Sequence, residues 1–154
     1  MDQIDALIEV LGIRSGSRVL DLGCGSGMIT EYISDTTGAQ ITGIDASRVG
    51  IQQAIGRTRE KRRHLVFEVG NLNVAALPEN AFDAVLLIDT IYFLEQEFVV
   101  RRAQAALKPG GQMGLFYSHW WDPGDAADAT QPENTSLAQH LRRCGLFFAK
   151  RDFS

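Results

Sequence analysis

The sequence predicts an α/β fold in which helices cover a mainly parallel β-sheet. Short apolar runs of strand character alternate along the chain with segments whose apolar residues recur at helical spacing. The run Phe82–Ile88 is almost continuously apolar, which is typical of a central strand buried on both faces of a parallel sheet. A turn with three glycines joins the first predicted strand directly to a helix. We therefore expect one domain spanning residues 1–154.

Composition fits this single domain. The 154 residues are 45% hydrophobic and 22% charged, which is ordinary for a soluble globular chain that can bury one core. A net charge of -4 and a pI near 5.3 disfavour a nucleic-acid partner, because such proteins carry basic surfaces. No apolar run approaches about 20 residues and no signal peptide is visible, so we expect a cytoplasmic chain with no membrane partner. Cys24 and Cys144 are expected to be free thiols, and we expect no metal site.

The first elements follow from residue spacing. Apolar residues at i, i+3, i+4 and i+7 predict an N-terminal amphipathic helix, which Gly12 can end. These apolar residues are Ile4, Leu7, Ile8 and Leu11. The first strand is predicted at Arg18–Leu22, and a second helix runs from the glycines to residues 37–38.

The most informative stretch is residues 19–27, which reads Val-Leu-Asp-Leu-Gly-Cys-Gly-Ser-Gly. Glycines permit positive φ angles and the close approach of a ligand, and the helix that follows offers unpaired N–H groups. The Gly-x-Gly-x-x-Gly pattern of dinucleotide-binding loops fails, because Met28 stands where its third glycine belongs. Asp21 would repel a phosphate but suits a ligand with a cationic amino group. The alternative is a turn that only joins a strand to a helix.

This stretch closely resembles the first motif of the Rossmann-like, class I S-adenosylmethionine-dependent methyltransferases. The resemblance covers nearly the whole chain, and Leu-Lys-Pro-Gly-Gly at residues 107–111 matches the turn before the family's fifth strand. It implies a doubly wound sheet of order 3-2-1-4-5 and S-adenosylmethionine as cofactor. It also implies that residues 21–27 lie against the methionine part and the ribose. The residues assigned to this contact are Asp21, Gly23, Cys24, Gly25 and Gly27.

The second strand, residues 40–44, is followed by Asp45 and Ala46. An acid at the carboxyl end of this strand is placed to accept hydrogen bonds from both ribose hydroxyls. The matching acid of the family binds the ribose in this way. Asp45 could also simply precede a helix capped by Ser47, and the two roles are compatible. We expect both residues to lie at the cofactor.

The helix from Ser47 is predicted to bury Ile51, Ala54 and Ile55. Its end and the residues after it are basic over residues 57–63. One interpretation is a nucleic-acid contact. We favour the other, in which cations near a helix C-terminus interact with the dipole and face solvent.

The third strand, residues 64–69, leads to Asn71 and Leu72. The family commonly has an acid at the position of Asn71, where it accepts a hydrogen bond from the adenine amino group. Asn71 can still accept through its carbonyl oxygen, although the charge is lost. By the same resemblance, Leu72 is expected to form an apolar wall for the adenine ring.

The fourth strand ends before Asp89, and Tyr92 follows shortly after. Ligands of open α/β sheets bind at the carboxyl ends of the strands, so we expect Asp89 at the cofactor. A helix at residues 95–107, a Lys-Pro-Gly-Gly turn and a fifth strand at residues 112–118 come next.

Catalytic candidates are His119 and Tyr92, both near the carboxyl ends of predicted strands. His119 titrates near neutrality and is suited to act as a general base. A structural role is the alternative for each. Trp120 and Trp121 follow His119 and could line an acceptor pocket or pack on the core.

The C-terminal part is predicted to hold a helix carrying Leu137 and Leu141 and a sixth strand at residues 146–152. In the family the sixth strand pairs with a seventh, and no residues remain here to form it. An open sheet edge favours aggregation. We therefore expect either that the chain is the core of a longer protein or that a partner covers this edge.

The expected function is methyl transfer from S-adenosylmethionine to a small-molecule acceptor. A non-catalytic module that only binds S-adenosylmethionine is one alternative. A dinucleotide-dependent oxidoreductase is another, disfavoured by Met28. A protein or RNA acceptor is also open, although the acidic charge disfavours RNA.

Overall fold

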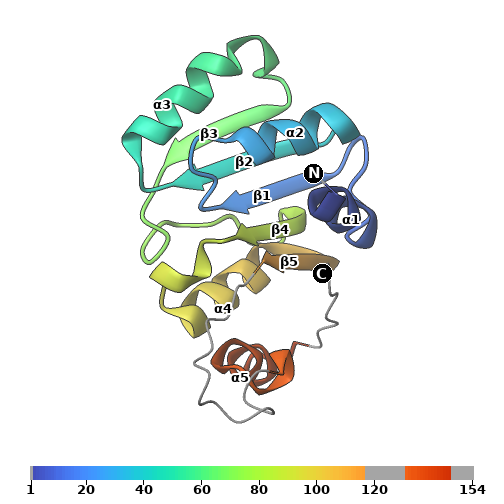
Figure 1. The fold of residues 1–154 in the computed structure, drawn as a ribbon, viewed down its shortest axis with the longest axis vertical. Helices are drawn as coiled ribbons and strands as arrows, with labels where there is room; N and C mark the ends of the chain where they lie inside the picture. Colours follow the sequence, from blue (N-terminus) through green and yellow to red (C-terminus); the bar gives the residue numbers. More distant parts are fainter. Residues whose placement is uncertain (1, 117–130, 147–154) are drawn as a thin grey trace.

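The computed structural model describes residues 2–116 and 131–146, which form an α/β fold around a parallel sheet (Figure 1). Its strands lie in the order β3-β2-β1-β4-β5, and each neighbouring pair is parallel. They are β1 (Arg18–Leu22), β2 (Gln40–Asp45), β3 (Leu65–Val69), β4 (Phe82–Ile88) and β5 (Leu107–Phe116). The predicted fold class and strand order are confirmed. The order reverses between β1 and β4, where such sheets form a ligand-binding crevice.

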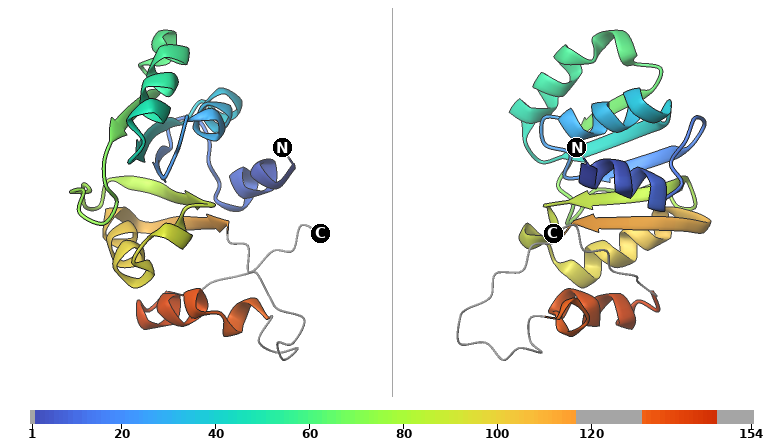
Figure 2. Two further views of the ribbon diagram at one scale, coloured as in Figure 1. Left: turned by 60° about the vertical axis from the view of Figure 1, so that its left-hand side comes forward. Right: turned by 45° about the vertical axis from the view of Figure 1, so that its right-hand side comes forward.

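Helices cover both faces of this sheet (Figure 2). One face packs against α1 (Asp2–Val10), α2 (Met28–Thr37) and α3 (Arg48–Arg57). The other packs against α4 (Gln96–Ala106) and α5 (Ser136–Arg143). Short 3-10 turns lie at Arg59–Lys61, Ile91–Phe93 and Pro132–Asn134. The described chain therefore has two hydrophobic cores, one on each side of the sheet.

The centre of the sheet belongs to both cores. Successive side chains of a strand point to opposite faces, so Leu86 packs with α1 to α3 and Leu87 with α4 and α5. Both side chains are fully buried. This burial on two faces confirms that the apolar run Phe82–Ile88 is a central strand.

Helix ends follow the predicted signals. Gly38 ends α2 with a φ of 74°, and its N–H donates to the Ser34 carbonyl at 2.8 Å. The Ser47 side chain caps α3 by accepting a hydrogen bond from the Gly50 N–H at 3.1 Å.

Two local predictions were wrong. Ile55 is 43% exposed, whereas Ile51 and Ala54 are buried, because α3 turns only a narrow apolar stripe toward the sheet. The fifth strand begins at Leu107 and not at residue 112. The predicted turn lies inside it as an irregularity, since Phe82 pairs with Leu107 while Ala84 pairs with Gln112. The first glycine of this turn, Gly110, has a φ of 80°.

Several expectations fall outside the described residues. These are the end of the fifth strand, His119, Trp120, Trp121 and nearly all of the predicted sixth strand. Within residues 2–116 and 131–146, no helix is long and apolar enough to span a bilayer.

Candidate cofactor site

The predicted cofactor residues gather at the carboxyl edge of the sheet. Parallel strands bring their carboxyl ends to one edge, so residues far apart in sequence meet there. The glycine loop, residues 23–27, follows β1, and Asp45 ends β2. Asn71 follows β3, and Asp89 follows β4. The topology alone places these four groups around the point where the strand order reverses.

The glycine loop is held by backbone hydrogen bonds at both ends. The Gly23 N–H donates to the Ile44 carbonyl at 2.7 Å, which ties the loop to β2. The Gly27 N–H donates to the Cys24 carbonyl at 2.8 Å, immediately before α2 begins. Gly23, Gly25 and Gly27 all have positive φ angles, of 83°, 55° and 71°. This backbone path strongly favours glycine.

The three glycines differ in what surrounds them. A Cβ at Gly23 would overlap the Thr90 side chain, and one at Gly27 would lie 2.5 Å from the Phe67 ring. At Gly25 no atom of the described chain lies within 4 Å of the Cβ position. Gly23 and Gly27 are therefore needed for packing within the protein. Gly25 leaves open space beside the loop, as a ligand that presses on the backbone requires.

Asp45 joins the glycine loop to the start of α3. One carboxylate oxygen, Oδ2, accepts from the Gly25 N–H at 2.8 Å, and Oδ1 accepts from the Ser47 N–H at 2.7 Å. A carboxylate offers about four acceptor positions, so each oxygen keeps capacity for another donor. Asp45 is partly exposed at the carboxyl edge and is fixed in orientation. It can accept hydrogen bonds from a diol such as a ribose.

Asp21 lies beneath the loop and not on its surface. Its carboxylate is 3% exposed and accepts a hydrogen bond from the Thr30 hydroxyl, on the first turn of α2, at 2.6 Å. Burial raises the pKa of Asp21 to about 6, an effect that the Thr30 hydrogen bond opposes and the Asp45 charge reinforces. Asp21 therefore presents almost no surface to a ligand that lies above the loop.

Cys24 is partly buried in the glycine loop. Burial, together with the carboxylates of Asp21 and Asp45, raises the pKa of the Cys24 thiol. The thiol therefore stays protonated at neutral pH and is a poor nucleophile. Within the described residues, the Cys24 side chain packs against its neighbours and contacts the Gly25 carbonyl.

The residues predicted to contact adenine lie in the segment that follows β3. Asn71 is exposed, and its side-chain carbonyl already accepts from the Asn73 N–H at 3.0 Å. Leu72 is 8% exposed and packs in the core beside α4, so little of its surface remains for a ligand. Val74 is 74% exposed in the same loop. Ala46, at the end of β2, is exposed.

The segment after β4 forms the other side of the reversal point. Asp89 has a φ of 50°, a conformation that few non-glycine residues adopt and that concentrates at functional sites. The Tyr92 hydroxyl donates to Asp89 Oδ1 at 3.4 Å. Thr90, which sequence reasoning missed, donates to the Gly23 carbonyl at 3.2 Å and so bridges the two sides. Its position after a strand was the only available signal. His119 lies outside the described residues.

Metal ligation finds no support in the described chain. No group of three or more His, Cys, Asp or Glu side chains there is arranged to hold an ion.

The sheet order, the glycine loop and the acid at the end of β2 define a Rossmann-like nucleotide-binding domain. The chain matches the family model of the methyltransferase domain over residues 19–111, and it belongs to the class I S-adenosylmethionine-dependent methyltransferases. The cosubstrate of this family is S-adenosylmethionine.

Among curated relatives, a sterol 24-C-methyltransferase of Aspergillus fumigatus is 34% identical over 134 residues. The match covers 85% of this chain and 35% of that protein. Phosphoethanolamine N-methyltransferase 1 of Triticum aestivum is 30% identical over 122 residues, covering 79% of this chain and 24% of that protein. The chain thus spans about a third or less of the length of these relatives.

A similar solved structure is that of the cyclase SpnF. It superposes with a TM-score of 0.76 at 26% identity, over 93% of this chain and 56% of that one.

Proposed function

We propose that this chain holds the cofactor-binding core of a methyltransferase that acts on a small-molecule acceptor. The observation that carries the proposal is the pairing of Gly25 with Asp45. Gly25 leaves open space beside the loop, and the carboxylate that holds its N–H is fixed at the carboxyl edge with acceptor capacity remaining. A ligand with a ribose and a chain lying along the loop fits this pairing.

Each predicted contact then has a defined task. Asp45 accepts hydrogen bonds from the ribose hydroxyls, and the glycine loop lets the ligand approach the backbone closely. Asp21 provides a negative field for the cationic amino group, and Asn71 offers a side-chain amide to the adenine edge. S-adenosylmethionine, when bound, supplies an activated sulfonium methyl group. The remaining work of the protein is to align the acceptor and exclude water.

The relatives support a small-molecule acceptor without fixing the acceptor atom. Their names specify a carbon of a sterol and the nitrogen of phosphoethanolamine. Of the two catalytic candidates, Tyr92 lies within the described residues. It could accept a proton from the acceptor, since it lies beside Asp89 at the carboxyl edge. A base is needed only where the acceptor is protonated at the working pH.

Calorimetric titration with S-adenosylhomocysteine, with NAD as control, tests the proposed cofactor site. We expect the wild-type chain to bind S-adenosylhomocysteine and not NAD. Asp45→Ala should weaken binding by at least about tenfold, because it removes the ribose acceptor and the bond to Gly25. Wild-type binding that Asp45→Ala leaves unchanged would place the cofactor elsewhere.

The second candidate is a module that binds S-adenosylmethionine without transferring its methyl group. SpnF, a structural neighbour, is named as a cyclase, so this architecture is compatible with a role other than methyl transfer. The two candidates differ in methyl transfer. Incubation with methyl-labelled S-adenosylmethionine and a panel of sterol, amine and phenol acceptors should give labelled product for the methyltransferase. The non-catalytic module should bind S-adenosylmethionine and give no labelled product with any acceptor of the panel.

A further inference from the structure

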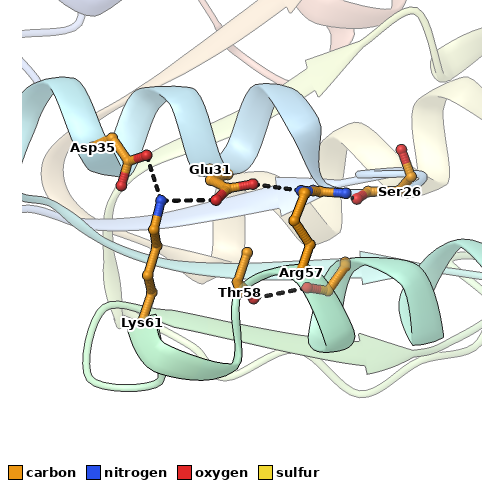
Figure 3. A network of polar contacts seen from close by, with 7 residues as sticks. Ser26, Glu31, Asp35, Arg57, Thr58 and Lys61 are labelled. Carbon is orange, nitrogen blue, oxygen red and sulfur yellow. Dashed lines mark hydrogen bonds and ion pairs between the residues drawn. The ribbon is translucent and has the colours of Figure 1, made fainter.

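Arg57 of α3 links the glycine loop to the first turn of α2 (Figure 3). It lies in the last turn of α3 and donates from Nη2 to the Ser26 carbonyl at 2.7 Å. Its Nε donates to Glu31 Oε2, in the first turn of α2, at 2.5 Å. Lys61 completes the network by contacting the other oxygen of Glu31 at 2.7 Å and Asp35 at 2.5 Å.

Three side chains from outside the loop hold its backbone in the described structure. Asp45 accepts from the Gly25 N–H, Thr90 donates to the Gly23 carbonyl, and Arg57 donates to the Ser26 carbonyl. Asp45 and Thr90 come from the carboxyl ends of β2 and β4, where the proposed ligand lies. Arg57 comes from the last turn of α3 and not from the end of a strand.

The guanidinium geometry explains why an arginine suits this position. Two different nitrogens of one rigid, planar group reach two acceptors on two elements, a carbonyl of the loop and a carboxylate of α2. A lysine ammonium is a point charge on a flexible stem and cannot reproduce this fork. Hydrogen bonds from Arg57 and then Lys61 hold the pKa of Glu31 below its usual range. Glu31 therefore stays ionised near neutrality and keeps Arg57 oriented.

We propose that Arg57 is a positioning residue for the cofactor, and this rests on the proposed function above. It holds the Ser26 carbonyl so that the loop keeps its ligand-ready path. Three glycines within five residues give the loop many alternative conformations, and a ligand must exclude these before it binds. Arg57 reduces that cost without touching the ligand.

Lys61 provides a matched control. It has the same charge, contacts the same Glu31 and lies in the 3-10 turn after α3, but no hydrogen bond joins it to the loop. Arg57→Met and Lys61→Met each remove one cation from the network, and only Arg57→Met frees the Ser26 carbonyl. Arg57→Lys keeps the charge beside Glu31 and loses the fork.

Calorimetric titration with S-adenosylhomocysteine compares these variants of the full chain. We expect Arg57→Met and Arg57→Lys to weaken binding about tenfold, and Lys61→Met to change it less than about twofold. The melting temperature of Arg57→Lys should fall much less than that of Arg57→Met, because the charge beside Glu31 is kept. Equal losses of affinity in Arg57→Met and Lys61→Met would overturn the proposal, because the ion pairs and not the loop contact would then matter.

Hydrogen exchange of the ligand-free chain tests the same point independently of the cofactor. The Gly25 and Gly27 N–H groups should exchange faster in both Arg57 variants and at the wild-type rate in Lys61→Met. Unchanged exchange in the Arg57 variants would overturn the proposal. If the wild-type chain bound no S-adenosylhomocysteine, the proposed function would fail, and the exchange rates alone would decide whether Arg57 orders the loop.

Discussion

At the scale of single residues, the burial of Asp21 makes the stability of the fold depend on pH. Its pKa is raised to about 6, so the native state binds this proton more tightly than the unfolded chain between about pH 4 and pH 6. The stabilisation from this group is complete below about pH 4 and is lost as the pH rises through 6. Above that range, the buried charge costs at most about 3 kcal/mol of unfolding free energy.

Asp21→Asn removes this cost and keeps an oxygen that accepts from Thr30. At pH 8 we expect the variant to exceed the wild type in unfolding free energy by about 1–3 kcal/mol, with the difference close to zero at pH 4. Urea unfolding at the two pH values measures this. A difference independent of pH would mean that Asp21 titrates normally. The variant should also bind S-adenosylhomocysteine more weakly, since the field on the amino group is lost.

The residue scale also shows where sequence reasoning reached its limit. Motif spacing correctly brought Asp21, Gly25 and Asp45 to one edge. The basic run over residues 57–63 leads to the interpretation of Arg57 as a cation facing solvent. In the structure, Arg57 binds Glu31 and the Ser26 carbonyl, 26 and 31 residues away. No local pattern encodes such a contact, because it depends on how α2 and α3 lie beside each other.

At the scale of elements, the glycines of the loop differ in role. Gly23 and Gly27 are needed for packing within the protein, and Gly25 is proposed to face the ligand. Gly25→Ala should cost about 1–2 kcal/mol of stability from the positive φ alone and weaken S-adenosylhomocysteine binding strongly, because the new methyl fills the ligand's space. Gly16→Ala is a matched control, with a φ of 85° and equally open surroundings at the other end of β1. It should have a similar stability cost and unchanged binding. Thermal melts and calorimetry test both variants, and equal binding by the two would argue against a ligand beside Gly25.

Element boundaries were predictable where a cap or a glycine marked them, as at Gly12 and Gly38. Boundaries were not predictable where the pairing of one strand with another determines them. The Lys-Pro-Gly-Gly segment has turn composition, yet it lies within β5 because β4 pairs on both sides of it. Leu72 packs in the core that contains α4 and α5, which sequence spacing did not indicate, and its contact with adenine stays a prediction.

At the scale of the molecule, two cores share one sheet and are expected to unfold together. Leu86→Ala and Leu87→Ala each remove a fully buried side chain from a different core. Each should lower the unfolding free energy by about 2–5 kcal/mol. Circular dichroism and intrinsic fluorescence should report one common transition for each variant. Separate transitions in either variant would mean that the two layers are independent units.

The overall fold was the most predictable level, because alternating strands and helices allow few topologies. The continuous apolarity of Phe82–Ile88 is enough to predict the centre of the sheet. Which segment or partner covers the edge beyond β5 stays a prediction, as does the single-domain assignment of residues 1–154.

The proposed cofactor contacts all lie within or directly after one of the first four strands in sequence order, between residues 21 and 89. Selection for cofactor binding therefore acts on little more than the first half of the chain. Within the described chain, residues beyond β5 provide none of the proposed cofactor contacts. Chimeras joined after β5 between this chain and a relative would keep the proposed cofactor site and replace the residues in which the sequence places candidate acceptor contacts.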